Sequence, residues 1–172
     1  MSYSYDQLRV LVVEDNQHTR ALIRSVLQNL GFNAGHIREA FDGLSALEEL
    51  QKEAVHIVIS DWRMEPMDGL TFVRTLRDPE KSPDPFVPVI LCSAYTDQEL
   101  IESARDIGIN EIIAKPISIG NIKSRIHAIL DKPRPFVNAS NYFGPDRRRR
   151  RGPVTTGQER RGEPGTKPRG SS

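Results

Sequence analysis

At 172 residues the chain has room for one domain and an extension, because a domain commonly spans roughly 100 to 200 residues. The net charge of +1 hides an acidic body, residues 1–131 with 13 Lys and Arg against 20 Asp and Glu, and a basic tail, residues 132–172 with 11 against 3. The single cysteine excludes an internal disulfide, and with no transmembrane-length apolar run and no signal-peptide pattern we expect a cytoplasmic protein without a transmembrane segment.

Five short apolar runs alternate with five amphipathic segments along the acidic body. We expect strands at residues 8–13, 36–40, 55–59, 89–92 and 111–114. Each run is followed by apolar residues at helical spacing, and the first helix is expected to begin after a cap at Asn16 and to end at Gly31. The fourth helix is expected to begin after Thr96 or Asp97, and the fifth after Ser118.

This alternation indicates an α/β fold. Strands that alternate with helices pair in parallel through right-handed crossovers, which places helices on both faces of one sheet. Beyond residue 131, Pro, Gly and Arg dominate and apolar residues become rare. We therefore expect a folded domain at residues 1–131 and a disordered basic tail at residues 132–172.

The run at residues 55–59 leads directly into an exposed carboxylate. It continues through Ser60 to Asp61, and Pro66 and Gly69 then close a turn. Ligand sites in open parallel sheets lie at the carboxyl ends of the strands. Asp61 is therefore expected at the functional edge of the sheet.

Other chemically active residues end three further strands, and parallel strands all end at the same edge. They are Glu14, Asp15, Ser93 and Lys115. Three neighbouring carboxylates repel one another unless a cation lies among them, and Mg²⁺ fits because it prefers hard oxygen ligands. An aspartate can accept a phosphoryl group, and a lysine and a serine beside it can hold the phosphoryl oxygens.

Together these motifs resemble the signature of the response-regulator receiver domain of bacterial two-component signalling, of the chemotaxis-regulator type. The resemblance covers residues 6–131 and rests on Glu14-Asp15, on DWRMEPMDG from Asp61 to Gly69, on Ser93-Ala94 and on Lys115-Pro116. It implies a flavodoxin-like, doubly wound sheet of five parallel strands in the order 2-1-3-4-5, with five helices.

The resemblance also implies a phosphoryl acceptor and a metal. Asp61 would accept the phosphoryl group from a histidine kinase or a histidine phosphotransfer protein. Mg²⁺ would be bound by Asp15, by Asp61 and by the backbone carbonyl of Arg63, and Glu14 would assist through a metal-bound water. The protein would catalyse its own phosphorylation and a slow dephosphorylation, and would not be a metabolic enzyme.

Further residues would hold or modulate the phosphoryl group. Ser93 and Lys115 would contact its oxygens, and the bond from Lys115 to Pro116 would be cis. Arg63 and Tyr95 would set how long the phosphoryl group survives. Phosphorylation would signal to an unknown downstream protein by direct contact, without a DNA-binding output domain.

One switch position departs from the family. Ser93 is present, but three residues before Lys115, where the family often has a Tyr or Phe that rotates on phosphorylation, this chain has Ile112. An isoleucine is short and stiff about its first side-chain torsion, so the usual aromatic switch is absent. This departure favours an alternative function, a receiver-fold scaffold that does not switch.

An arginine run in the tail leaves three roles open. It can bind nucleic acid or an anionic surface with a strong dependence on salt, it can be a solubilising extension, or it can lie on the acidic body. The first role gives a second alternative function, nucleic-acid binding regulated by the receiver. The run consists of Arg147, Arg148, Arg149, Arg150 and Arg151.

Overall fold

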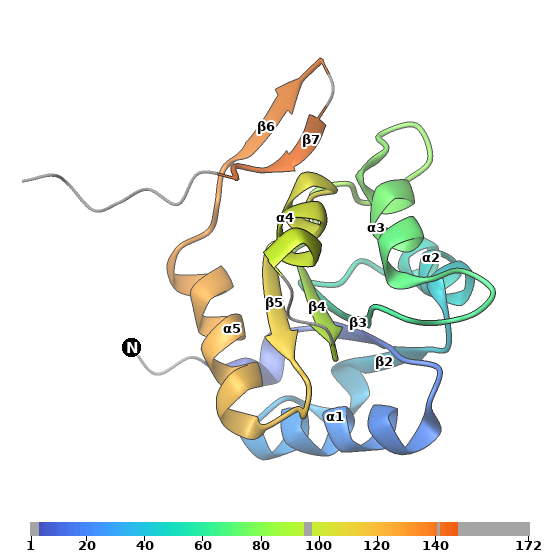
Figure 1. Cartoon of the computed structure of the whole chain (residues 1–172). Helices are drawn as coiled ribbons and strands as arrows, with labels where there is room; N and C mark the ends of the chain where they lie inside the picture. The colour runs from blue at the N-terminus through green and yellow to red at the C-terminus, as the bar shows by residue number, and fades with distance from the viewer. Residues whose placement is uncertain (1–3, 95–97, 141, 148–172) are drawn as a thin grey trace, which may run out of the picture.

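Five parallel strands form the centre of the fold, in a computed structural model that describes residues 4–94, 98–140 and 142–147 (Figure 1). The strands are β1 (Val10–Val13), β2 (Ile37–Ala40), β3 (Ile57–Asp61), β4 (Val89–Ser93) and β5 (Glu111–Ala114). Their order is β2-β1-β3-β4-β5, and every neighbouring pair is parallel. The fold class and the strand order expected from the sequence are confirmed.

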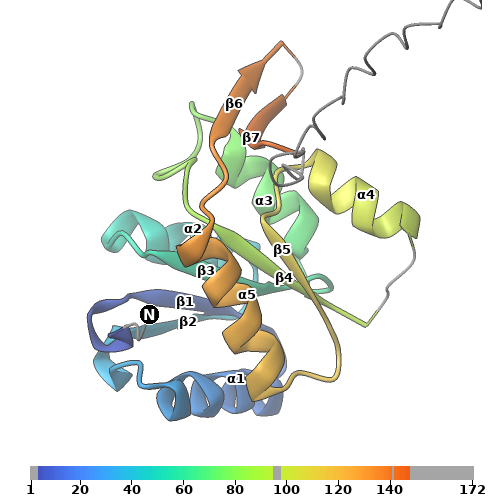
Figure 2. The same cartoon turned by 90° about the vertical axis from the view of Figure 1, so that its left-hand side faces the viewer.

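Five α-helices cover the sheet. They are α1 (Gln17–Leu30), α2 (Gly43–Lys52), α3 (Gly69–Arg77), α4 (Gln98–Asp106) and α5 (Ile119–Asp131), and two short 3-10 helices, η1 (Tyr5–Gln7) and η2 (Ala34–His36), precede β1 and β2. Figures 1 and 2 show α1 and α5 on one face of the sheet and α2, α3 and α4 on the other. Among the described residues, no helix is both long and apolar enough to span a membrane.

Side chains that alternate along each strand fill two cores, one on each face of the sheet. On β1, Leu11 and Val13 belong to the core that also contains Phe72 of α3. Val10 and Val12 belong to the core on the opposite face. All four β1 side chains are fully buried, which is why this strand is apolar at every position.

Polar caps and one glycine define helix ends. Asn16 and Ser118 each accept a hydrogen bond from the backbone N–H three residues later, at 3.0 and 3.2 Å. Gly31 ends α1 with φ at 104°, in the left-handed region that favours glycine. These three predicted boundaries are confirmed, whereas Thr96 and Asp97 lie outside the described residues.

An antiparallel hairpin follows α5, in a segment where the sequence indicated disorder. β6 (Phe136–Ala139) pairs with β7 (Tyr142–Pro145), and the Asp146 N–H donates to the Pro135 carbonyl at 2.8 Å. The expectation of disorder is therefore wrong for residues 136–139 and 142–145. Residues 148–172 lie outside the described residues.

Aromatic side chains explain how so short a segment packs on the body. The rings of Phe136 and Phe143 each lie 5.3 Å from the ring of Phe86, between centroids. Tyr142 is only 8% exposed. Because each aromatic side chain buries a large apolar area, three of them attach a hairpin whose overall apolar content is low.

Candidate active site

The carboxyl ends of four strands bring the predicted residues to one edge of the sheet. The residues at the ends of β1, β3, β4 and β5 are Glu14, Asp61, Ser93 and Lys115. The strand register and the backbone hydrogen bonds set their neighbours. Asp61 is paired with Cys92 on β4, and the Lys115 N–H donates to the Ser93 carbonyl at 2.8 Å.

Lys115 lies between two of the carboxylates. Its Nζ is 2.9 Å from Asp61 Oδ1 and 3.5 Å from Glu14 Oε2, and the bond to Pro116 is cis, as the resemblance implies. Burial disfavours the ammonium charge, but the hydrogen bond to Asp61 and the charges of Asp61 and Glu14 outweigh this effect and raise the pKa of Lys115. The lysine therefore remains a cation beside Asp61.

Three carboxylates form a group that can bind a metal ion. One oxygen from each of Glu14, Asp15 and Asp61 lies within 4.8 Å of the other two. Glu14 and Asp61 are buried, at 1% and 8% exposure, whereas Asp15 is exposed. The expectation that Asp61 is exposed is therefore wrong, because its neighbours at the sheet edge cover it. Such a group of hard oxygen donors fits Mg²⁺, which prefers carboxylate and water ligands.

The electrostatics of Glu14 agree with a cation site. Burial raises the pKa of Glu14 to about 7, and the charge of Asp61 adds to the rise. The Asn16 N–H, which donates to Glu14 Oε1 at 3.1 Å, and the charge of Lys115 oppose the rise without cancelling it. A buried carboxyl in a charged cluster with so perturbed a pKa is typical of functional sites.

Comparison with known proteins identifies the family. Residues 10–127 match the family model described as the response regulator receiver domain. The chain belongs to this family. The chemotaxis protein CheY-3 of Vibrio cholerae is 31% identical over 125 residues, which cover 73% of this chain and 93% of the relative. A probable chemotaxis protein CheY of Rhizobium etli is 33% identical over 126 residues, covering 73% and 94%.

Solved structures share the receiver fold. The Vibrio cholerae chemotaxis protein CheY4 superposes with a TM-score of 0.64 at 26% identity, over 71% of this chain and 98% of that one. A chain of the CheX-CheY-BeF3-Mg+2 complex from Borrelia burgdorferi gives a TM-score of 0.64 at 26% identity, over 72% and 89%. The family match ends at residue 127, so the β6–β7 hairpin lies beyond the receiver model.

Two residues outside the predicted set of reactive and metal-binding residues also shape this receiver site. The Gly69 N–H donates to the Trp62 carbonyl at 2.8 Å, and a Cβ on Gly69 would lie 2.2 Å from the Asp61 carbonyl oxygen. Only glycine fits so close a backbone approach, and its place in the acidic motif was the available signal. Arg20 of α1 donates to the Glu14 carbonyl at 2.8 Å, a contact that no pattern in the sequence indicates.

The predicted modulating residues of the receiver lie in different surroundings. Arg63 is exposed two residues after Asp61. Tyr95 lies outside the described residues. Ile112 on β5 is partly buried and packs against the core that contains Phe72. The roles of Arg63, Tyr95 and Ile112 remain predictions.

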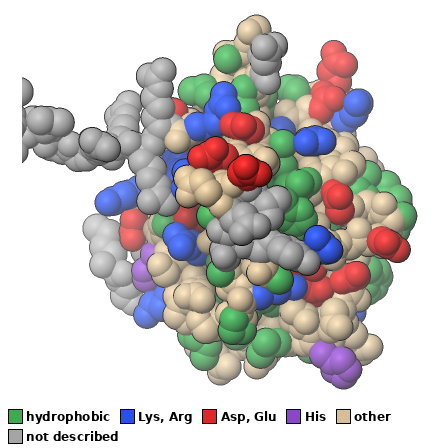
Figure 3. All heavy atoms as spheres, in the orientation of Figure 1, with side chains coloured by type: hydrophobic (Ala, Val, Ile, Leu, Met, Phe, Trp, Pro, Cys, Tyr) green, Lys and Arg blue, Asp and Glu red, His purple; other side chains and the backbone are tan. Residues whose placement is uncertain are grey.

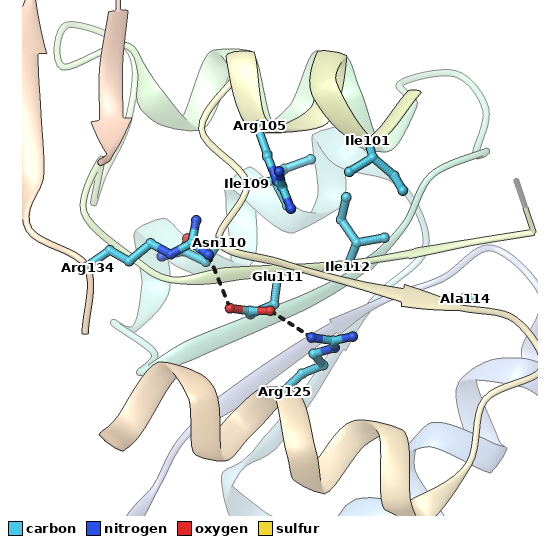
Figure 4. Close-up of a pocket in the computed structure, with 9 residues that line it drawn as sticks. All are labelled: Ile101, Arg105, Ile109, Asn110, Glu111, Ile112, Ala114, Arg125 and Arg134. Atoms are coloured by element: carbon cyan, nitrogen blue, oxygen red, sulfur yellow. Dashed lines mark hydrogen bonds and ion pairs between the residues drawn. The ribbon is translucent and has the colours of Figure 1, made fainter. Parts of the chain in front are cut away.

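A pocket of about 230 Å³ lies beside Ile112, between α4, β5 and α5 (Figure 4). Figure 4 shows the Ile112 side chain pointing toward Ile101 of α4. Below them, Glu111 forms ion pairs with Arg125 at 3.2 Å and with Arg134 at 3.7 Å. In this receiver, β5 therefore faces α4 through an aliphatic side chain where the family often has an aromatic switch.

The arginine run begins at the opposite end of the sheet, beside the hairpin. The structure describes the first arginine of the run, Arg147, whose guanidinium forms an ion pair with Asp106 at the end of α4. The remaining predicted binding residues, Arg148, Arg149, Arg150 and Arg151, lie outside the described residues. Within the described part of the run, Arg147 thus lies apart from the acidic site, at the other end of the sheet.

Proposed function

We propose that this receiver is a cytoplasmic response regulator of a bacterial phosphorelay, and that a histidine kinase or a histidine phosphotransfer protein phosphorylates it on Asp61. The observation that carries the proposal is the buried position of Asp61, with Lys115 Nζ at 2.9 Å and two further carboxylates beside it. This arrangement supports phosphoryl transfer, in which Asp61 would be the nucleophile, Lys115 a positive charge beside it, and the carboxylates the metal ligands.

Asp15, Asp61 and Glu14, with the backbone carbonyl of Arg63, are the groups that would hold Mg²⁺ here. When bound, the ion neutralises the negative charge on the phosphoryl oxygens. The closely spaced carboxylate oxygens support this assignment, because they are the donors that Mg²⁺ prefers. So does the Borrelia burgdorferi relative, whose solved complex contains BeF3 and Mg+2.

The chain's own residues supply the transfer step. A carboxylate oxygen of Asp61 attacks the phosphorus of a phosphohistidine, and the new O–P bond forms as the P–N bond breaks. The imidazole leaves and takes a proton from solvent. Lys115, already in contact with Asp61, would stabilise the charge on the phosphoryl oxygens, and the Ser93 hydroxyl would donate a hydrogen bond to one of them.

The output would be a protein–protein contact. The segment that follows Ser93 leads directly into α4, so a phosphoryl group held by Ser93 would act first on this part of the chain. Ile112 would transmit the change through packing against the core and not through the rotation of an aromatic ring. A partner that distinguishes the two forms of the receiver would complete the signal.

The test is a titration of Trp62 fluorescence, first with Mg²⁺ and then with beryllofluoride, a mimic of the phosphoryl group. Trp62 is the only tryptophan and follows Asp61 directly. We expect a saturable change at each step. Asp61→Asn should lose the second step, whereas Glu48→Gln, which neutralises an exposed carboxylate on α2, should keep both. Intact mass after incubation with acetyl phosphate should show one phosphoryl group on the wild type and on Glu48→Gln, and none on Asp61→Asn.

Two results would contradict the proposal. One is a wild-type protein whose Trp62 responds to neither ligand and that shows no heat of binding by calorimetry. That result would favour the non-switching scaffold suggested by Ile112. The other is binding of Mg²⁺ without any response to beryllofluoride or any phosphorylation, which would leave a metal site without phosphoryl transfer.

A further inference from the structure

The hairpin carries the start of the arginine run to the end of α4. Tyr142 of β7 is buried, and a Cβ on Gly144 would lie 3.0 Å from the Cα of Gly108, just after α4. The hydrogen bond from the Asp146 N–H to the Pro135 carbonyl closes the base of the hairpin. Packing therefore fixes the hairpin, and with it the residue before Arg147, near the end of α4.

The first arginine of the run is held at this point by two contacts. The guanidinium of Arg147 lies 4.4 Å from the centroid of the Tyr142 ring and 2.5 Å from Asp106 Oδ1. A cation over an aromatic face and an ion pair both favour this position. A positive charge at the carboxyl end of α4 also complements the helix dipole.

From this point, an acidic face extends along the outside of α4. Glu99, Glu102 and Asp106 are exposed and recur at helical spacing, so they lie on one face of the helix. Figure 3 shows acidic side chains gathered over α4. Within the described part of the chain, Asp106 is the one carboxylate of the three that pairs with a cation.

We propose that the arginines after Arg147 lie along this outer face of α4 and pair in turn with Glu102 and Glu99. Seven residues separate Asp106 from Glu99, a distance of about 10 Å along a helix. An extended chain advances about 3.3 Å per residue, so three to four residues after Arg147 cover the same length. The contact continues the ion pair that the structure already contains.

The consequence is a masked binding segment. While the arginine run lies on α4, a polyanion must compete with the helix for the same guanidinium groups. Exposed ion pairs are individually weak and are screened by salt, so the contact is reversible. The inference does not depend on phosphorylation of Asp61 and can fail or hold independently of it.

The first test reads the proximity of the tail to α4 in the full chain. A nitroxide is attached to a Thr155→Cys variant, while Cys92 stays unlabelled because burial raises the pKa of its thiol to about 12. We expect the label to broaden the amide signals of Glu99, Glu102 and Asp106 at low salt, and the broadening to disappear at high salt. Unbroadened α4 signals at low salt would overturn the inference.

Two double variants with the same net charge separate this contact from a general charge effect. Glu99→Gln/Glu102→Gln removes the proposed partners, and Glu48→Gln/Glu80→Gln removes two exposed carboxylates elsewhere. We expect the first to lose the broadening on α4 and to bind a single-stranded DNA oligonucleotide several-fold more tightly than the second. Broadening that survives in the first variant, or equal DNA affinities of the two, would overturn the inference.

Discussion

Two cations lie at opposite ends of the sheet, and they differ in burial and in partners, because the Lys115 side chain is 27% exposed whereas Arg77 is buried. Lys115, at the carboxyl edge, contacts the carboxylates of Asp61 and Glu14. Arg77, at the end of α3, is 4% exposed and interacts with the charge of Asp84, but its hydrogen-bond acceptors are all neutral. They are the backbone carbonyls of Gly108, Pro85 and Val87 and the side-chain oxygen of Asn110.

This difference distinguishes Arg77, which joins parts of the fold, from Lys115, which lies among possible metal ligands. The carbonyls around Arg77 are fixed by the backbone, and the ring of Phe136 covers the guanidinium at 5.0 Å, so the arginine joins the hairpin to the body. The carboxylates around Lys115 lie at the carboxyl edge of the sheet and, with the exposed Asp15, form a group that could hold a metal ion. A cation among fixed neutral acceptors stabilises the fold, whereas one among carboxylates at an edge can take part in a reaction.

The largest expected effect concerns Arg77. Arg77→Met removes four hydrogen bonds and leaves buried carbonyls without donors, so we expect the free energy of unfolding to fall by about 4 kcal/mol. Chemical denaturation measures the loss. The control Arg74→Met, on the exposed side of α3, should be nearly as stable as the wild type. Equal stability of the two variants would show that the hydrogen bonds of Arg77 do not stabilise the fold.

The next effect concerns the rate of phosphorylation at Lys115. Lys115→Met removes the positive charge beside Asp61, and we expect phosphorylation by acetyl phosphate to slow about 100-fold, as when one preorganised donor to a transition state is lost. Lys123→Met, on the exposed side of α5, is the matched control. If both variants react at the wild-type rate, the position of Lys115 has no chemical role.

A third prediction concerns pH and Glu14. Burial raises the pKa of Glu14 from 4.5 to about 7, so the metal-free folded protein binds a proton below about pH 7 that the unfolded chain binds only near pH 4.5. The contribution of this group to the free energy of unfolding therefore rises as the pH falls through that window, by on the order of 2 kcal/mol. In denaturation curves measured at pH 5 and pH 8, the wild type should gain stability at pH 5, and Glu14→Gln should lack this gain. Glu48→Gln should retain it, and a Glu14→Gln profile that matches the wild type would contradict the assignment.

The smallest effect concerns Arg147, an exposed arginine that follows the hairpin, whereas Arg77 contacts the hairpin from α3. Its side chain and that of Asp106 are 49% and 62% exposed, so the ion pair should contribute only about 0.5 kcal/mol to stability. Arg147→Gln should therefore shift the denaturation midpoint slightly at low salt and not at all at high salt. If Arg147→Gln lowered the free energy of unfolding as much as Arg77→Met, exposure would not explain how much each arginine contributes to stability.

Much of the fold could be predicted from residue patterns, because along residues 8–131 the local strand and helix signals agree with the topology of a parallel sheet. Apolar runs predicted the strands, and caps such as Asn16 and Ser118 predicted helix starts. The hairpin was missed because its stability does not come from apolar content along the chain. It comes from three aromatic side chains that meet Phe86 and Arg77 of distant segments.

The acidic edge could be deduced from sequence order for a physical reason. Parallel strands all end on one side, so Glu14, Asp61 and Lys115 had to converge once each was recognised as a strand-end residue. Their convergence needed no side-chain detail. The need for glycine at position 69, set by the Asp61 carbonyl oxygen, and the burial of Arg77 among carbonyls from two other segments depended on through-space packing. The contacts of Arg77 with these carbonyls join α3 to other segments, up to 31 residues away in the chain, and the periodic pattern of a single helix or strand does not encode them.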